Sequence, residues 1–314
     1  MVVNWDEYGT YIRGRGGSTG GNLFWYIGKN NDHIEDHLWA LDLISNNIDE
    51  TKIEIDVRIT DGSQPDQNNT TATMEKSGRA LVLSKFLGLL KVIGGNSYEL
   101  TLAYEKLVEQ GNPTTMDEIR QNDSFFQTLT DQFEKFYYFQ SPIFKDNENT
   151  QASKTIFKIY PIFFVYEVLV LLKKKYNLES MLTKDECKYF LFLAYEQQQA
   201  AAVAEKISKY RNSGEQESII AKIKPIENGA LDSRVFNCFE LCKYFDFQRN
   251  QSISVNEENF KIIESKVSKF KELIGKGDLI QWNSDSPEQF LELLYSKKDL
   301  LDYHYSYLLR KANS

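Results

Sequence analysis

Several cationic and amide side chains occur where they could contact a nucleic acid. Lys76, Ser77, Arg79 and Lys85 lie within one segment with helical spacing. An arginine can donate two hydrogen bonds to the edge of a guanine, whereas lysine and serine side chains hold phosphate oxygens. This segment therefore predicts a helix whose polar face enters the major groove of DNA.

Two further groups have the same chemistry. Arg234 and Asn237 lie at the start of another predicted helix, where Asn237 would suit adenine. Arg13 and Arg15 lie in a glycine-rich stretch, residues 9–21, which is expected to be an arm that reaches a groove or phosphates. A plain flexible arm without DNA contact is an equal alternative for that stretch.

The first group belongs to a helix, a hairpin and a second helix between Met74 and Gly111. Residues 94–96 are Gly, Gly and Asn, which accept positive φ and suit a short hairpin loop, and Thr101 can cap the helix that follows. This order is the second half of a winged helix. Apolar residues recur at helical spacing before the hairpin: Leu81, Leu83, Phe86, Leu87 and Leu90.

The same order recurs near the C-terminal end. Asp232 can cap a helix that extends to Phe245, a hairpin is predicted around Arg249, and Asn256 can cap the next helix. Residues 286–309 then predict one or two amphipathic helices.

The middle of the chain predicts three helices, over 159–176, 182–193 and 200–210. Thr183 and Glu186 have the spacing of a capping box at the start of the second helix. This part resembles a helix-turn-helix core without a wing of its own.

Nearer the N-terminus, residues 52–60 alternate as a half-buried strand and 61–73 predict a polar loop. Residues 115–139 have a helical, aromatic-rich pattern. The fold class expected is therefore mainly α with small β-hairpins, an α+β chain of tandem winged-helix and helix-turn-helix modules. The expected divisions are 1–145 (arm and first winged helix), 146–228 (second, helical module) and 229–314 (third winged helix with C-terminal helices).

Catalytic and metal-binding patterns give no convincing match. His33 and His37 are spaced for one helix face but have no evident third ligand, and Cys238 and Cys242 have no second pair of ligands. The strand over 52–60 is not followed by the E-x-K of a metal-dependent nuclease, and residues 9–21 do not match a nucleotide-binding loop. We therefore predict no catalytic residue, metal ligand or cofactor in this chain.

Composition limits the class of protein. The 314 residues are 41% hydrophobic and 26% charged, which indicates a folded chain of two or three domains. No signal sequence or membrane span is expected, and three cysteines without a disulfide framework fit a reducing, cytoplasmic location. The net charge of −8 argues against a purely nonspecific DNA binder, because phosphate attraction needs local positive charge.

Four stretches together resemble the N-terminal DNA-recognition region of AlwI-type type IIS restriction endonucleases and related nicking endonucleases. They are SGRALVLSKFLGLL, YELTLAYEKLVEQGNP, IYPIFFVYEVLVLLKKKYNLESMLTKDECKYFLFLAYEQQQAAAVAEKISKYRN and RVFNCFELCKYFDFQRNQSISV, over roughly residues 77–255. The resemblance implies tandem winged helices that bind double-stranded DNA at a short asymmetric site within a restriction-modification system.

The resemblance also implies a separate PD-(D/E)xK nuclease domain that uses Mg²⁺. The chain ends near where that domain would begin, so it is expected to be a recognition fragment or a specificity subunit, with a nuclease domain or subunit as its partner and Mg²⁺ only there. Two alternatives remain open. One is a winged-helix protein that binds proteins and does not cut DNA; the other is a complete metal-dependent nuclease within these residues.

Overall fold

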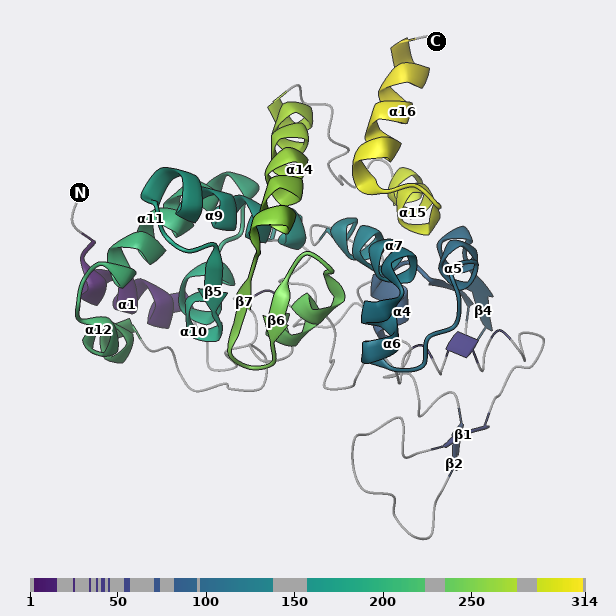
Figure 1. The fold of residues 1–314 in the computed structure, drawn as a ribbon, viewed down its shortest axis with the longest axis horizontal. Helices are drawn as coiled ribbons and strands as arrows, with labels where there is room; N and C mark the ends of the chain where they lie inside the picture. Colours follow the sequence, from purple (N-terminus) through teal and green to yellow (C-terminus); the bar gives the residue numbers. More distant parts are fainter. Residues whose placement is uncertain are drawn as a thin grey trace.

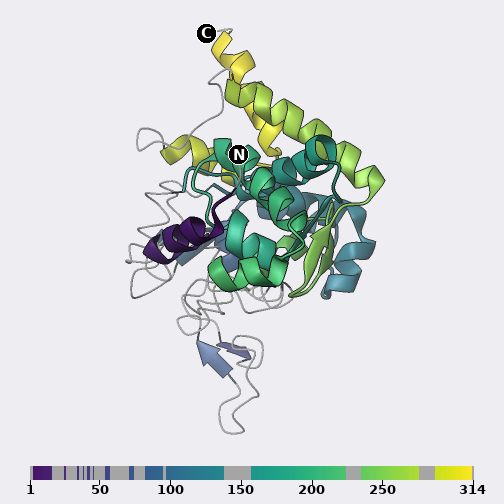
Figure 2. The same cartoon turned by 90° about the vertical axis from the view of Figure 1, so that its left-hand side faces the viewer.

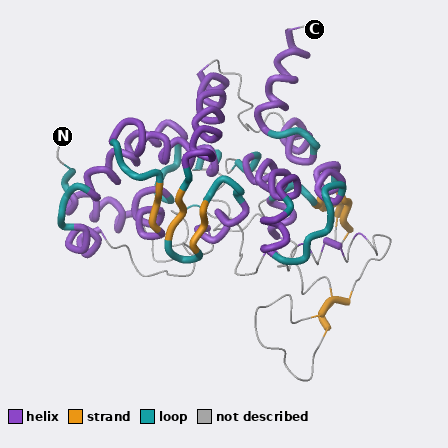
Figure 3. Tube along the Cα trace, in the orientation of Figure 1, coloured by secondary structure: helices purple, strands orange, loops and turns teal. Residues whose placement is uncertain are grey.

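The computed structural model describes residues 3–15, 25, 34, 38, 41–42, 45, 54–56, 71–73, 82–94, 97–137, 157–223, 235–275 and 287–312. Within these ranges the chain is mainly helical with short antiparallel strands, which confirms the predicted fold class at this level (Figures 1 and 3). The α-helices are α1 (Trp5–Arg15), α4 (Val82–Phe86), α5 (Leu102–Val108), α6 (Met116–Gln121), α7 (Asp123–Glu134), α9 (Pro161–Tyr176), α10 (Lys184–Glu186), α11 (Ala200–Arg211), α12 (Gln216–Ile223), α14 (Glu257–Gly275), α15 (Pro287–Tyr295) and α16 (Leu300–Ala312).

Shorter helical turns and strands complete the described elements. The π-helical turn η2 (Cys187–Leu191) follows α10, and the 3₁₀ turns are η3 (Gln197–Gln199) and η4 (Cys238–Leu241). The strands are β1 (Glu54–Asp56), β2 (Thr71–Thr73), β3 (Leu90–Gly94), β4 (Ser97–Leu100), β5 (Met181–Thr183), β6 (Asp246–Gln248) and β7 (Ser252–Ser254).

Helix α9 lies at the centre of the core. Its residues from Pro161 to Leu169 are all buried, and it packs against α7, α11 and α14. A helix that is apolar on all sides can be stable only when other elements surround it. Pro161 occupies the first turn, where its missing N–H costs nothing, and Asn177 ends the helix at φ 53°.

Strands β5, β7 and β6 form a three-stranded antiparallel sheet in the order β5-β7-β6. The hairpin of β6 and β7 confirms the one predicted around Arg249. The hairpin also pairs with β5, where Leu182 lies opposite Ile253, so this sheet contains strands from both sides of the predicted boundary at 228–229.

The predicted first hairpin is confirmed as β3 and β4, and the Thr101 hydroxyl caps α5 by accepting the N–H of Tyr104 at 3.3 Å. Strand β1 lies within the predicted strand over 52–60, but its partner β2 occupies the end of the stretch predicted as a loop. Pairing with β1 satisfies backbone groups that a polar loop would leave to water.

Several helix boundaries differ from the sequence-based ones. The stretch 115–139 contains two helices, because the Asn122 side chain accepts the N–H of Phe125 and starts α7 as α6 ends. The capping box of Thr183 and Glu186 is confirmed. The helix predicted to extend from Asp232 to Phe245 ends earlier, since η4 stops at Leu241.

Helix α1 corrects the expectation of an arm for residues 9–15, which continue a helix from Trp5, and residues 16–21 lie outside the described part of the chain. The Tyr8 hydroxyl donates to the carbonyl of Tyr189 at 2.8 Å, and the Tyr8 ring stacks on Phe190. Aromatic packing therefore outweighs the low helix propensity of Gly9 and Gly14. Trp25 is buried nearby, with its indole N–H bonded to Ala194 O at 2.7 Å.

Helices α15 and α16 confirm the predicted C-terminal helices. Helix α15 packs against α5, and α16 contacts α14. Figures 1 and 2 both place α14 on the side of the sheet opposite the turn of the β6–β7 hairpin. Among the described helices, none combines the length and the apolarity that crossing a lipid bilayer requires.

Candidate nucleic-acid interface

The outer face of the sheet β5-β7-β6 is mostly polar. Strand register aligns two rows of side chains across it, and every member is partly or fully exposed. Figure 1 shows the three strands side by side, toward the viewer. Hydroxyl and amide groups can bond phosphate oxygens and base edges without carrying charge. The rows are Met181, Ser254 and Asp246, and Thr183, Ser252 and Gln248.

The other face of the sheet packs against the hydrophobic core. Leu182 and Ile253 are fully buried, and the Phe247 ring lies 5.6 Å from that of Phe236. Alternation along each strand therefore separates an apolar row from the two outer rows.

The turn of the β6–β7 hairpin is exposed and firmly held. Arg249, Asn250 and Gln251 form it, and Asn250 adopts φ 59°, a left-handed conformation that asparagine tolerates. The N–H of Gln251 donates to Gln248 O at 2.9 Å, while its carbonyl accepts the N–H of Lys184 at 2.8 Å. The last bond joins the turn to the first residue of α10, so the hairpin and the helix present one surface.

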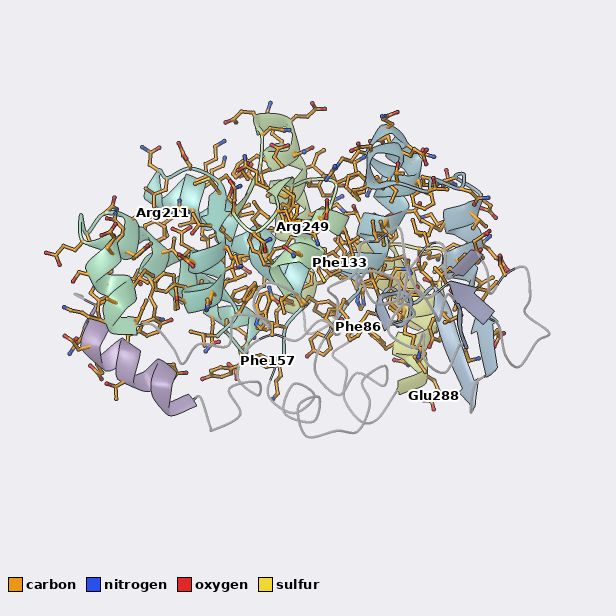
Figure 4. All side chains as sticks on the ribbon, turned by 90° about the horizontal axis from the view of Figure 1, so that it is seen from below. Phe86, Phe133, Phe157, Arg211, Arg249 and Glu288 are labelled. Atoms are coloured by element: carbon orange, nitrogen blue, oxygen red, sulfur yellow. The ribbon has the colours of Figure 1, made fainter. Side chains whose placement is uncertain are left out.

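Strand β5 is held from its other side by Arg211, at the end of α11. The guanidinium donates to both carboxylate oxygens of Glu186, at 2.7 and 2.8 Å, and to the carbonyls of Met181 at 2.6 Å and Glu179 at 3.2 Å. Glu186 also accepts the N–H of Thr183 at 2.9 Å. The ion pair of Arg211 and Glu186 thus fixes the edge of β5 against α10 and α11 (Arg211 is labelled in Figure 4).

The charge beside the hairpin is mixed. Glu240 accepts from Arg120 at 2.8 Å and lies 3.8 Å from the guanidinium of Arg249, whose side chain is 39% exposed. Exposed pairs at such a distance contribute about 0–1 kcal/mol, so a phosphate can compete for Arg249. Asp246 is exposed on β6, and Asp185 is exposed next to Lys184, whose N–H binds the hairpin turn; both carboxylates would repel phosphates.

The residues predicted from sequence to bind DNA fall mostly outside this surface or outside the described residues. Lys76, Ser77, Arg79 and Arg234 lie outside the described residues, as do His33 and His37. Arg13 and Arg15 are in the last turn of α1, and their side chains lie outside the described part. Each remains a prediction.

Two predicted residues are described in full. Lys85 lies in the last turn of α4 and is partly buried. Asn237 precedes η4, and its side-chain oxygen is buried with no hydrogen-bond partner among the residues that the structure describes. In this conformation its amide oxygen faces the interior instead of solvent.

Sequence reasoning missed the residues that organise the sheet. Arg211 was recognisable only as the end of a helix, since its partner Glu186 is 25 positions away. Gln248 and Ser252 lay in a recognised hairpin, but only the register with β5 places them beside Thr183. A hairpin sequence cannot indicate which distant strand it joins.

A second group of polar residues is buried along α7. Glu134 pairs with Lys266 of α14 at 2.7 Å and accepts the hydroxyl of Tyr166 at 2.8 Å. Burial raises the pKa of Glu134 despite the ammonium group of Lys266. Burial alone would lower the pKa of Lys266, but Glu134, Tyr244 and Asp131 together raise it above its usual value.

Lys135 is also completely buried. Its ammonium nitrogen donates to the Gln132 side chain at 2.5 Å and to Ser296 O at 2.8 Å. Burial lowers the pKa of Lys135 to about 7, although Asp131 and Asp299 oppose the shift. Such a group could act as a base, yet its full burial keeps a large substrate away and favours a structural role.

The cysteines are buried thiols. Burial raises the pKa of both Cys238 and Cys242 to about 12, and the sulfur of Cys242 lies 3.1 Å from the Tyr166 hydroxyl. A thiol must lose its proton to bind zinc, so this environment opposes metal binding. In the ranges that the structure describes, histidine, cysteine and carboxylate side chains form no group of three suited to a metal ion.

Comparison with known proteins adds no assignment. No protein-family model matches the chain, and no curated protein matches it.

Proposed function

We propose that this chain is a sequence-specific module that recognises double-stranded DNA. The observation that carries the proposal is the order of elements around the sheet. A helix (α9) precedes β5, the helical pair α10 and α11 follows it, and the hairpin β6–β7 joins β5 in the order β5-β7-β6. A winged helix has this order, with an insertion here between α11 and β6.

The chemistry of the exposed surface supports the same function. Gln248, Ser252 and Thr183 supply hydrogen-bonding groups in one row, and Arg249 extends from the hairpin turn (Figure 4). Arginine and amide side chains are the commonest readers of base edges, and hydroxyl groups hold the backbone.

We further propose the specificity region of a type IIS-like restriction or nicking endonuclease as the biological context. The sequence resemblance over roughly residues 77–255 supports this proposal. The cutting domain, with its Mg²⁺, would then be a partner of this module, and the module would supply the site preference.

A winged helix that binds proteins is the second candidate. The net charge of −8 and the exposed Asp246 on the outer sheet face favour it, because both oppose phosphate binding. A partner with basic side chains would complement that surface.

Selection from a randomised duplex library separates the two candidates. The full chain is incubated with the library at two salt concentrations, and the bound duplexes are sequenced. DNA recognition predicts one short asymmetric site, with affinity that falls as salt rises. No enriched sequence at low salt would favour the protein-binding candidate.

Two variants test whether the turn of the β6–β7 hairpin contacts the DNA. Arg249→Ala should weaken binding to the selected site and reduce the salt slope by about 1 if the guanidinium holds a phosphate. Lys269→Ala removes the same charge from the exposed surface of α14, which extends away from the hairpin turn (Figure 1). Equal effects of the two variants would mean that Arg249 acts only through net charge.

A further inference from the structure

Glu240 lies between two arginines that belong to different parts of the chain. Its Oε1 atom accepts a hydrogen bond from Arg120 of α6 at 2.8 Å, and its Oε2 atom lies 3.8 Å from the guanidinium of Arg249 in the hairpin turn. Figure 1 shows α6 beside the β6–β7 hairpin, and Arg249 is labelled in Figure 4. One carboxylate therefore joins α6 to the turn for which a DNA contact is proposed above.

The backbone on either side of Glu240 is held by the core. Phe239 and Leu241, its neighbours in η4, are buried, and the carbonyl of Leu241 accepts the buried Thr130 hydroxyl at 3.2 Å. The Glu240 side chain is 20% exposed. The position of its carboxylate beside the hairpin turn is therefore set by the core as well as by the two arginines.

The two arginines share this carboxylate unequally. Arg120 is hydrogen-bonded to it and also contacts Asp117 at 3.2 Å, so two carboxylates hold its guanidinium. Arg249 lies beyond hydrogen-bond distance, and its side chain is 39% exposed. Because the positive charge of Arg120 partly cancels the negative charge of Glu240, the attraction that retains Arg249 is weakened.

We propose that Arg120 and Glu240 set the ease with which Arg249 exchanges its carboxylate partner for a DNA phosphate, and that Arg120 retains Glu240 when this exchange takes place. This inference rests on the DNA-binding function proposed above. Arg120 and Glu240 are then positioning residues, because both act through Arg249 and neither contacts the DNA. Without Arg120, the full charge of Glu240 would hold Arg249 and compete with the phosphate.

The affinity of full-length variants for the duplex selected from the library tests this relationship. Glu240→Gln removes the negative charge, Arg120→Ala removes its hydrogen-bonded partner, and Arg120→Lys keeps a cation at that position. A double variant combines Arg120→Ala with Glu240→Gln. Glu105→Gln is the matched control for charge, because Glu105 pairs with Lys297 at 3.3 Å on α5, on the far side of α6 and α7 from the hairpin (Figure 1).

Glu240→Gln should bind the duplex about fivefold more tightly than the wild type, which is the effect of losing one partly exposed ion pair. Arg120→Ala should bind about fivefold more weakly, and Arg120→Lys should recover the wild-type affinity. The double variant should bind as tightly as Glu240→Gln, because no charge remains for Arg120 to offset. Glu105→Gln should change the affinity by less than about twofold, since salt screens distant charges.

Arg249→Ala provides a second test. When Arg249 is absent, Arg120→Ala should change the affinity by less than about twofold, because the residue through which Arg120 acts is missing. A loss of about fivefold in this background would overturn the inference, since Arg120 would then contact the DNA itself or act through net charge.

Other outcomes overturn different proposals. Additive effects of Arg120→Ala and Glu240→Gln would overturn this inference alone, as would an unchanged affinity in Arg120→Ala. A wild-type chain that enriches no duplex overturns the DNA-binding function and this inference with it. Arg120→Met replaces Arg120→Ala if the alanine variant does not fold, as judged by near-ultraviolet circular dichroism.

Discussion

Arg211 and Glu186 form a two-bonded ion pair that joins the end of α11 to the capping box of α10. The Arg211 side chain is 17% exposed and that of Glu186 is 3% exposed. The same guanidinium bonds the carbonyls of Met181 and Glu179, so it occupies backbone acceptors at the edge of β5. Occupied backbone acceptors protect an edge strand against pairing with other chains.

Replacing Arg211 should therefore be costly. Arg211→Met leaves the Glu186 carboxylate buried without its partner, and we expect the free energy of unfolding to fall by about 3 kcal/mol. Urea denaturation measures the change. Lys209→Met is the control, because Lys209 pairs with Glu205 on a partly exposed face of the same helix, and its replacement should cost less than about 0.5 kcal/mol. Similar losses in the two variants would show that the Arg211 contacts add little.

Gly88 occupies a position where the fold leaves no room for a side chain. It adopts φ +67°, and a Cβ atom there would lie 2.5 Å from both the Cγ and the carbonyl oxygen of Leu294. Gly88→Ala should thus cost at least about 2 kcal/mol, from backbone strain and from displacement of α15. Gly214→Ala has φ +71° with open space around it, so it should cost the strain alone, about 1 kcal/mol.

Thermal unfolding of the two glycine variants separates strain from steric overlap. A larger loss in Gly88→Ala than in Gly214→Ala would confirm the close contact with α15. Equal losses would mean that α15 moves aside without cost and that its position on the core is weakly determined.

Local signals in the sequence predicted local structure well. Thr101 and Thr183 were recognisable as caps because the hydroxyl and its N–H partner are three residues apart. The hairpin around Arg249 was recognisable because polar turn residues separate two short alternating segments. Each of these features depends only on residues that are a few positions apart in the sequence.

Structure that depends on distant residues could not be predicted in this way. Pairing of β5 with β7 joins residues about 70 positions apart, for example Leu182 and Ile253, and no pattern in either strand specifies it. Helix α1 forms where two glycines argue for an arm, because Trp5 and Tyr8 pack against Phe190. The candidate surface likewise appears only after β5 and the hairpin are brought together.

The buried pair of Glu134 and Lys266 gives a test of how α7 is held to α14. Lys266→Met leaves the Glu134 carboxylate, which is 1% exposed, without its ammonium partner, and should lower the free energy of unfolding by about 3 kcal/mol. The double variant Glu134→Gln with Lys266→Met should lose less, because the charge that remained has been neutralised. Additive losses measured by urea denaturation would show that the pair is not coupled.

The lowered pKa of Lys135 predicts how the free energy of unfolding changes with pH. Burial lowers its pKa to about 7 in the folded chain, whereas an unfolded lysine has a pKa of about 10.4. Between these values the unfolded chain binds more protons, so this residue makes stability rise with pH from about 7 to about 10, by up to about 1.4 kcal/mol per pH unit. Asp131 and Asp299 raise the pKa of Lys135 and Lys106 lowers it, and burial outweighs them to give the folded pKa of about 7.

Lys135→Met should remove this contribution, although it also removes the hydrogen bonds to the Gln132 side chain and to Ser296 O. The loss of these two bonds is nearly independent of pH, so it shifts the stability curve without changing its slope. Urea denaturation at several pH values between 7 and 10 therefore distinguishes the two effects. Lys298→Met, at an exposed lysine that contacts Ser306, controls for the loss of a surface charge. If the slopes of wild type and Lys135→Met are the same, Lys135 keeps its proton in the folded chain throughout this range.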